Sequence, residues 1–352
     1  MPDLAGGALV AAVSVLAFAF LIVVHELGHH LAARASRMRV ERFSIGFGPV
    51  LWKRRRGETE WAVSALPLGG YVRIAGMSPG EEIAPDDAGA YCNQPAWRRF
   101  AVILAGPAMN YLAALALAVA LVLGGALREP DPSPTVGEVM PGSAAEAAGL
   151  RTGDRVLAVD GKPVATWQEL VGEVLAHPGR PMALSVQRGG ETIPVQATPR
   201  DDGGRGRLGM AQGLRLVPRA GLADAVGKAV QATNQRAADV LSGLGQVLSR
   251  RQRAELRGPL GIAQEMARSA RAGAVPFLGM VWFISIVLAL FNLLPIPALD
   301  GGRLVFLVYE IVTRRRVDQR VENAVHLVGF VVLFALILGV TVFGDLARLF
   351  GR

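Results

Sequence analysis

Four long apolar stretches dominate the pattern of hydrophobic and polar positions along the chain. They cover residues 4–24, 100–127, 272–299 and 327–343, and none contains Asp, Glu, Lys, Arg or His. The hydrocarbon core of a bilayer is about 30 Å thick, and a helix crosses it with about 20 residues, within a range of about 17–25. Buried core helices would give a similar signal, but four such runs in one chain of 352 residues favour membrane spans.

The segment between the first two stretches has a different pattern. Residues 40–75 contain short β-prone runs that glycine and proline interrupt, first at 46–49 and again at 67–70. This pattern predicts hairpins. The segment is too apolar for a free loop, so we expect a β region that dips against the membrane, where irregular backbone must be buried in protein or line a wet cavity. Residues 76–96 are acidic and turn-rich and predict a loop.

Between the second and third stretches the sequence predicts a compact module at about 135–200, preceded by a linker at 130–134. Residues 201–209 are expected to be flexible, and apolar positions at helical spacing over 222–250 predict an amphipathic surface helix. The elements expected in the module are strands at 136–140, 155–159, 182–188 and 192–197 and a helix at 167–176.

The predicted fold is a polytopic α-helical membrane protein with four transmembrane helices, a membrane-associated β region and one extracytoplasmic α+β module. Its segments are the first span (1–34), the β region with its loop (35–96), the second span (97–127), the linker and module (128–209), an amphipathic segment (210–271), the third span (272–302), a basic loop (303–320) and the fourth span with the C-terminus (321–352).

Composition and charge support this organisation. Hydrophobic residues make up 51% of the chain and charged residues only 19%, against about 25% charged in an ordinary globular protein. The net charge of +8 could suggest a nucleic-acid partner, but the basic residues cluster beside the apolar stretches, at 34–56, 98–99 and 314–320. Basic residues near span ends mark the cytoplasmic side of a membrane, so the pattern indicates a lipid bilayer and no nucleic acid.

The same charges predict a topology. Residues 34–99 and 300–324 are expected inside, and both termini and residues 128–271 outside. The first stretch has no basic segment before it and no small-residue cleavage site after it, so we expect a retained helix and not a signal peptide. Cys92 is the single cysteine, which excludes an internal disulfide framework.

Candidate chemistry begins at residues 25–29, where the sequence is HExxH. Histidines at i and i+4 lie about 40° apart around a helix, so His25 and His29 can bind one Zn²⁺. Glu26 between them is placed to act as general base on a water that attacks a peptide carbonyl. Ionisable side chains at membrane depth are costly and usually functional, although a polar helix end facing the lipid headgroups is the simpler alternative.

A hydrolytic zinc site needs a third protein ligand and one open position. Asp300 is the best candidate, because two prolines break the apolar run just before it and two glycines follow it. His30 points about 140° away from His25 around the helix, and His177 lies in the outer module. His326 at the start of the fourth span remains an alternative ligand.

The chain resembles the site-2 protease family of intramembrane zinc metalloproteases. The resemblance is carried first by HExxH at the end of the first span together with Asn-x-x-Pro-x-Pro-x-Leu-Asp-Gly at 292–301. Further segments resemble the bacterial regulator-of-sigma-E protease type, and the likeness covers nearly the whole chain. These segments are 43–49 and 67–72 in the β region, 106–110 in the second span and 258–264 before the third span.

The resemblance implies a zinc metalloendopeptidase of the bacterial inner membrane with its active site toward the cytoplasmic face. It implies zinc ligands at His25, His29 and Asp300, catalysis by Glu26, and substrate contacts from Asn292 and Pro295. A helix-capping role for Asn292 is the alternative. The implied substrates are single-span membrane proteins such as an anti-sigma factor, cut in regulated intramembrane proteolysis after an upstream site-1 protease, with the β region holding the substrate as an added strand.

The outer module resembles a bacterial PDZ domain. Residues 137–150, the pair Gly153 and Asp154, and residues 159–161 follow the expected order of strand, turn, short helix and strand. PDZ domains bind extended peptides, and a β-rich module without a peptide ligand is the alternative. Relatives of the enterobacterial type have two such domains in tandem, whereas this sequence has one.

Two functions of other classes compete with the protease. A membrane scaffold could hold partners through the module, but it would need none of His25, Glu26, His29 and Asp300. A zinc-handling membrane protein would be expected to have more histidines and carboxylates in its spans. The sequence therefore favours the protease.

Overall fold

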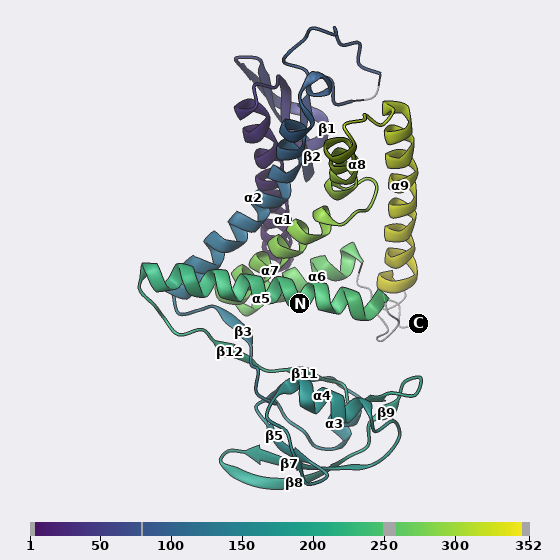
Figure 1. The fold of residues 1–352 in the computed structure, drawn as a ribbon. Helices are drawn as coiled ribbons and strands as arrows, with labels where there is room; N and C mark the ends of the chain where they lie inside the picture. The colour runs from purple at the N-terminus through teal and green to yellow at the C-terminus, as the bar shows by residue number, and fades with distance from the viewer. Residues whose placement is uncertain (1–3, 79, 249–257, 347–352) are drawn as a thin grey trace. The chain divides into compact units, whose positions relative to one another are not determined.

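The computed structural model describes residues 4–78, 80–248 and 258–346, and these form two compact units (Figure 1). One unit contains Met1–Gly124 and Ala220–Arg352, and the other is Gly125–Arg219. The first three residues, the last two residues of the helix expected at 222–250, residues 251–257 of the amphipathic segment, and the C-terminal residues 347–352 lie outside the described part.

The four predicted spans are confirmed as helices of the first unit. They are α1 (Leu4–Ala35), α2 (Ala96–Leu123), α7 (Ala274–Leu293) and α9 (Gln319–Gly339), the last continued by a π-helical turn at Val340–Leu346. All four are long and apolar enough to cross a membrane. Pro107 lies inside α2, where packing against neighbouring helices can satisfy the backbone groups that a proline frees.

The predicted C-terminal boundary of the third span, residue 302, is wrong. Leu294, which precedes Pro295, has the extended conformation with ψ of 143°, because a following proline disfavours the α region. Helix α7 therefore ends at Leu293, and residues 294–299 form a loop. The prediction of a basic loop at 303–320 is also wrong for most of that segment, because residues up to Thr313 belong to helix α8 (Asp300–Thr313).

The β region is confirmed as two long, bent strands, β1 (Val40–Arg56) and β2 (Thr59–Ile74). Residues 42–45 pair with 70–73 in reverse order on one side and with 60–63 in the same order on the other. The bend of β1 passes through Gly46 with φ of 88° and Gly48 with φ of 83°, values that glycine adopts without steric cost. Leu51 and Trp52 near the hairpin end are apolar side chains that are 70% and 52% exposed.

A shared core joins this sheet to the helices that carry the site. Its buried residues come from α1, from the ends of β1 and β2, from α2 and from α8, and include Ala33, Val40, Ile74, Val102, Ile103, Leu304 and Leu307. The burial of α8 residues in this core explains why 300–313 form a packed helix although the sequence around Arg303 suggested a loop.

Two further helices complete the first unit. The predicted amphipathic helix is α5 (Leu222–Leu248), and α6 spans Pro259–Ala272. α5 packs against α2 and α7, and its small residues Ala225 and Ala229 are fully buried. Trp282 of α7 donates from Nε1 to the Thr233 hydroxyl at 3.2 Å, which ties the two helices together.

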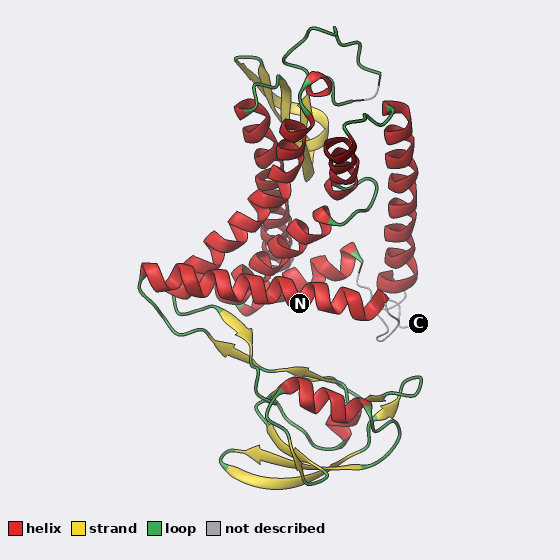
Figure 2. Ribbon diagram, in the orientation of Figure 1, coloured by secondary structure: helices red, strands yellow, loops and turns green. Residues whose placement is uncertain are grey.

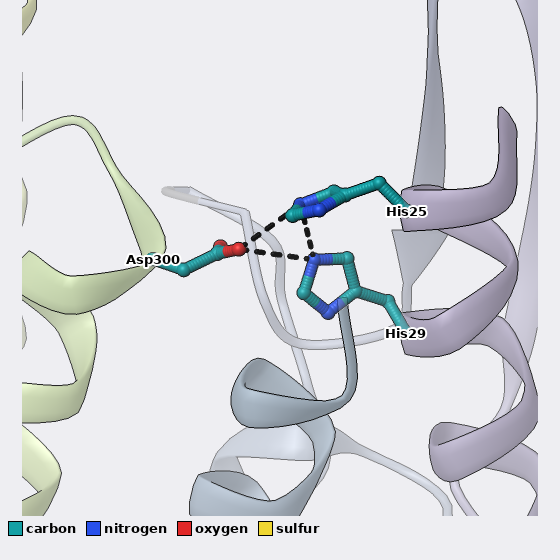
Figure 3. Close-up of side chains that lie close together, drawn as sticks. All are labelled: His25, His29 and Asp300. Carbon is teal, nitrogen blue, oxygen red and sulfur yellow. Dashed lines mark hydrogen bonds and ion pairs between the residues drawn. The ribbon is translucent and has the colours of Figure 1, made fainter. Parts of the chain in front are cut away.

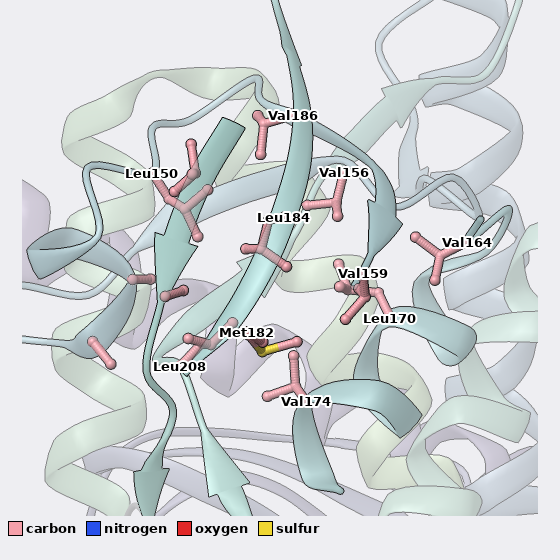
Figure 4. Packing of buried hydrophobic residues seen from close by; sticks show 14 residues of the cluster. Leu150, Val156, Val159, Val164, Leu170, Val174, Met182, Leu184, Val186 and Leu208 are labelled. Carbon is pink, nitrogen blue, oxygen red and sulfur yellow. The ribbon is translucent and has the colours of Figure 1, made fainter. Parts of the chain in front are cut away.

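The second unit is built on a four-stranded sheet of order β6-β5-β7-β8, coloured yellow in Figure 2. The strands are β5 (Arg155–Val159), β6 (Lys162–Pro163), β7 (Met182–Arg188) and β8 (Glu191–Ala197). Helices α3 (Ala144–Ala147) and α4 (Trp167–Leu175) pack with them around one hydrophobic core (Figure 4). The strands predicted at 155–159, 182–188 and 192–197 and the helix predicted at 167–176 are thus confirmed.

The second unit also contains a buried carboxylate, that of Asp154, which is 1% exposed. Arg188 donates to both carboxylate oxygens, at 2.7 and 2.6 Å, and the N–H of Arg151 donates at 2.8 Å. Burial alone would raise the pKa of the Asp154 carboxyl, but these bonds and the charge of Arg188 outweigh it and lower the pKa.

The predicted boundary of the module at 209 is wrong. β4 (Val136–Val139) pairs with β11 (Met210–Gln212), and β3 (Arg128–Pro130) pairs with β12 (Leu214–Leu216). The segment expected to be flexible contains a small hairpin of β9 (Arg200–Asp201) and β10 (Gly206–Arg207). The β4–β11 and β3–β12 pairings join residues that are far apart in the sequence, so the unit extends to Arg219.

Candidate metal centre

Three side chains from two helices converge within the first unit (Figure 3). Nε2 of His25 and Nε2 of His29, both on α1, lie 3.2 Å apart. Oδ2 of Asp300, the first residue of α8, lies 3.0 Å from the His25 nitrogen and 3.3 Å from the His29 nitrogen. Among the described residues, these three form the group that could hold a metal ion.

The donor set fits zinc in chemistry and in spacing. Two imidazoles and one carboxylate are a known ligand set of hydrolytic zinc sites, which keep a fourth position open. Zinc–nitrogen distances of about 2.0–2.1 Å in a tetrahedral site place neighbouring ligand atoms ~3.3 Å apart, close to the three distances given above. Oδ2 of Asp300 is buried, and apart from the two imidazole nitrogens it has no polar partner in the described part of the chain, as expected of an oxygen that would bind a cation.

Close helix packing creates the site. A Cβ at Gly28, inside HExxH, would lie 2.2 Å from the carbonyl oxygen of Ala105, so α1 and α2 are in backbone contact at this point. A Cβ at Gly106 of α2 would lie 2.3 Å from Nε2 of His29 and 2.8 Å from Nε2 of His25. Because Gly106 has no side chain, the two imidazole nitrogens can lie directly against the backbone of α2.

The hydrogen bond of Nδ1, the ring nitrogen of His29 that faces away from the ligand group, fixes the tautomer of this side chain. Nδ1 of His29 lies 2.8 Å from the carbonyl oxygen of Val102. A carbonyl can only accept a hydrogen bond, so Nδ1 carries the proton and Nε2 presents its lone pair to the centre. A metal-binding histidine is commonly oriented by a carbonyl or carboxylate in this way.

Asn110 lies beside Nδ1 of His25, as the carbonyl of Val102 lies beside Nδ1 of His29. It is 1% exposed, its Nδ2 lies 3.3 Å from Nδ1 of His25, and its Oδ1 has no partner among the described residues. Oxygen and nitrogen of an amide are assigned from the hydrogen-bond network. Exchanging them places Oδ1 where it accepts a hydrogen from Nδ1 of His25 and frees Nε2 for a metal, matching the arrangement at His29.

Glu26 lies between the two histidines on α1 and contacts the sheet. Its Oε2 accepts a hydrogen bond of 3.0 Å from the backbone N–H of Val72 on β2. A Cβ at Gly70 would lie 3.7 Å from Cγ of Glu26, so the strand passes directly beside this side chain. The β region thus orients a carboxylate next to the ligand group.

The other predicted site residues do not join the three ligand atoms. Asn292 donates from Nδ2 to the carbonyl oxygen of Leu288, 3.0 Å away on its own helix, and Pro295 is exposed in the loop 294–299. Nδ1 of His326 accepts a 3.0 Å hydrogen bond from the N–H of Ala298 and is not part of the ligand group. The alternative of His326 as third ligand therefore has no support from the geometry.

Sequence reasoning missed the part played by α2 and β2. Gly106 and Asn110 fall in the segment 106–110, for which the sequence shows only a resemblance to a family motif, and Val72 and Val102 act through backbone groups that carry no sequence signal. A buried glycine and a buried amide four residues apart, on one face of an apolar helix, were the available clue.

Comparison with known proteins identifies the family of this chain. The family model of peptidase family M50 matches residues 13–336. The chain is 30% identical to zinc metalloprotease RasP of Geobacillus kaustophilus, over 96% of this chain and 97% of that protein. It is 36% identical to metalloprotease MmpA of Caulobacter vibrioides, over 96% and 94%. It is 28% identical to regulator of sigma-E protease RseP of Salmonella typhimurium, over 95% and 98%. The chain therefore belongs to peptidase family M50.

Proposed function

We propose that this peptidase is a zinc metalloendopeptidase that cuts single-span membrane proteins in or beside their transmembrane segment. The observation that carries the proposal is the convergence of His25, His29 and Asp300, with Nε2 and Oδ2 atoms 3.0–3.3 Å apart, in a chain with four helices able to span a membrane. Relatives over nearly the full length are named zinc metalloproteases.

Each residue has a separate task in this proposal. His25, His29 and Asp300 hold the zinc, and Val102 and Asn110 keep the two imidazoles in the binding tautomer. When bound, zinc supplies Lewis acidity, which acidifies water and polarises a carbonyl. Glu26, oriented by the Val72 N–H, accepts the proton of the attacking water and returns it to the leaving amine.

The substrate must be extended before it can be cut, because a helical peptide bond is shielded and hydrogen-bonded. Residues 70–73 pair with 42–45 on one side, and Val72 directs its N–H toward Glu26. A substrate strand added at this edge would lie beside the carboxylate. Asn292 and Pro295 are the proposed contacts to the unwound backbone, and the bond of Asn292 to Leu288 matches the alternative capping role.

The proposed location is the bacterial inner membrane, with the active site toward the cytoplasm and both termini and the 125–219 unit outside. The basic residues that flank the spans support this topology. We infer that the outer unit is a PDZ-like domain that restricts which ectodomains approach, and that the substrate is an anti-sigma factor already trimmed by a site-1 protease. The name of the relative from Salmonella typhimurium, regulator of sigma-E protease, supports the last inference.

A cleavage assay with a model single-span substrate tests the proposal. Glu26→Gln should lower cleavage by at least ~10²-fold, because the amide cannot accept the proton. Glu41→Gln is the matched control, since Glu41 pairs with Arg73 on the β region and should leave cleavage near normal. Cleavage by Glu26→Gln at the wild-type rate would contradict the proposal.

A further inference from the structure

The fourth span meets the rest of its unit along one narrow stripe. No described residue of α9 is buried, and its half-buried positions include Glu322, His326, Gly329 and Leu333, which recur at helical spacing. Two of them, His326 and Gly329, contact the loop 294–299 that leads to Asp300.

The loop contains an unusual backbone conformation at this point. Ala298 has φ of 78°, a left-handed value that is sterically unfavourable for a residue with a Cβ. Such conformations persist when the surroundings over-determine them. The N–H of Ala298 donates to Nδ1 of His326 at 3.0 Å, so the strained residue is held by a side chain of the fourth span.

Close contacts fix the loop from both sides. A Cβ at Gly329 of α9 would lie 2.2 Å from Cβ of Pro297, so the helix backbone lies directly against the proline. On the other side, a Cβ at Gly301 would lie 2.0 Å from the carbonyl oxygen of Leu294, and one at Gly302 would lie 2.6 Å from that of Ile296. The loop is clamped between α8 and α9, and Asp300 follows Ala298 by two residues.

The protonation of His326 follows from this bond. Because Nδ1 accepts from a backbone N–H, the ring is neutral with its proton on Nε2. An acceptor at the Nδ1 position is therefore the chemical property that the loop requires. The Oδ1 atom of an asparagine can occupy a similar position, whereas leucine keeps bulk but provides no acceptor.

We propose that His326 is a positioning residue for the metal site: by accepting the Ala298 N–H it holds the left-handed turn that sets Oδ2 of Asp300 against the two histidines. This inference rests on the proposed function, because it takes Asp300 as a zinc ligand. It assigns His326 a role through the backbone and not as a ligand, and it makes the fourth span part of the active-site scaffold.

The test uses the full-length, zinc-loaded protein. Four proteins are compared: wild type, His326→Leu, His326→Asn and the double variant His326→Leu with Ala298→Gly. For each protein we measure the zinc that is retained during timed dialysis against a chelator. The visible spectrum of each cobalt-substituted protein is also recorded. His326→Leu should lose zinc about tenfold faster, the lower end for residues that orient ligands, and its cobalt spectrum should change. His326→Asn restores the acceptor and Ala298→Gly removes the strain, so both should return retention close to wild type.

Controls separate the possible failures. Leu327→Ala alters the neighbouring, 65% exposed residue and should retain zinc as wild type does. Wild-type retention and spectrum in His326→Leu, or an asparagine variant as defective as the leucine variant, would overturn the inference. His326→Phe gives a second variant without an acceptor if the leucine variant does not fold. A wild-type protein without zinc, or zinc unaffected by His25→Ala, would instead overturn the proposed function.

Discussion

The backbone N–H of Val72 donates to Oε2 of Glu26 at 3.0 Å, which joins the edge of the β region to the proposed general base. This contact links two functions of the same strand. The strand orients the carboxylate, and it is also the edge at which we propose that an extended substrate is added. Substrate placement and base placement are therefore coupled through residues 70–73.

Removing this donor should impair chemistry and leave zinc in place. Val72→Pro has no N–H to donate, so we expect turnover to fall about tenfold or more while zinc content stays near wild type. Val72→Ala keeps the N–H and is the matched control. The measurement is the cleavage rate and the zinc content of both purified variants. Normal turnover in Val72→Pro would show that the contact does not orient Glu26.

The partner of His25 gives a second prediction. Asn110→Leu removes the acceptor for Nδ1 of His25, so zinc affinity should fall about 10- to 100-fold, as for other groups that orient metal ligands. Asn110→Asp keeps an oxygen at this position and should stay much closer to wild type. A competition titration with a chromophoric chelator measures both affinities. Equal losses in the two variants would mean that the site depends on packing at Asn110 and not on the hydrogen bond.

The packing of α2 against the ligands gives a third prediction. Gly106→Ala introduces a methyl group 2.3 Å from Nε2 of His29, a separation that requires the imidazole to move. We expect zinc binding and cleavage to be lost together. Gly227→Ala in α5, where a Cβ has nothing within 4 Å, is the control and should keep both. A Gly106→Ala protein with full zinc occupancy would contradict the close approach of α2.

How much of this site was predictable depended on the distance between its parts in the sequence. His25 and His29 were predictable because one helical turn brings them together, and Asp300 because prolines and glycines surround it. The helix at Asp300–Thr313 was missed, since its burial depends on contacts with β1, β2 and α2. The strand pairs β4 with β11 and β3 with β12 were missed for the same reason.

The topology can be tested with the single cysteine. Cys92 is half-buried in the segment that the basic residues place inside. A membrane-impermeant thiol reagent should leave it unlabelled in cells whose outer envelope is open and label it after the inner membrane is permeabilised. In a Cys92→Ser background, Glu191→Cys at an exposed position of the outer unit should be labelled without permeabilisation. The opposite pattern would place the active site toward the outer face.

Zinc content of the purified protein tests the central claim most directly. The account predicts one zinc per chain in wild type and in Glu26→Gln, because Glu26 is a base and not a ligand. It predicts little or no zinc in Asp300→Ala, because Asp300 supplies the third ligand from α8. Full zinc occupancy with normal cleavage in Asp300→Ala would contradict the account, since the convergence of Asp300 with His25 and His29 would then have no role in metal binding.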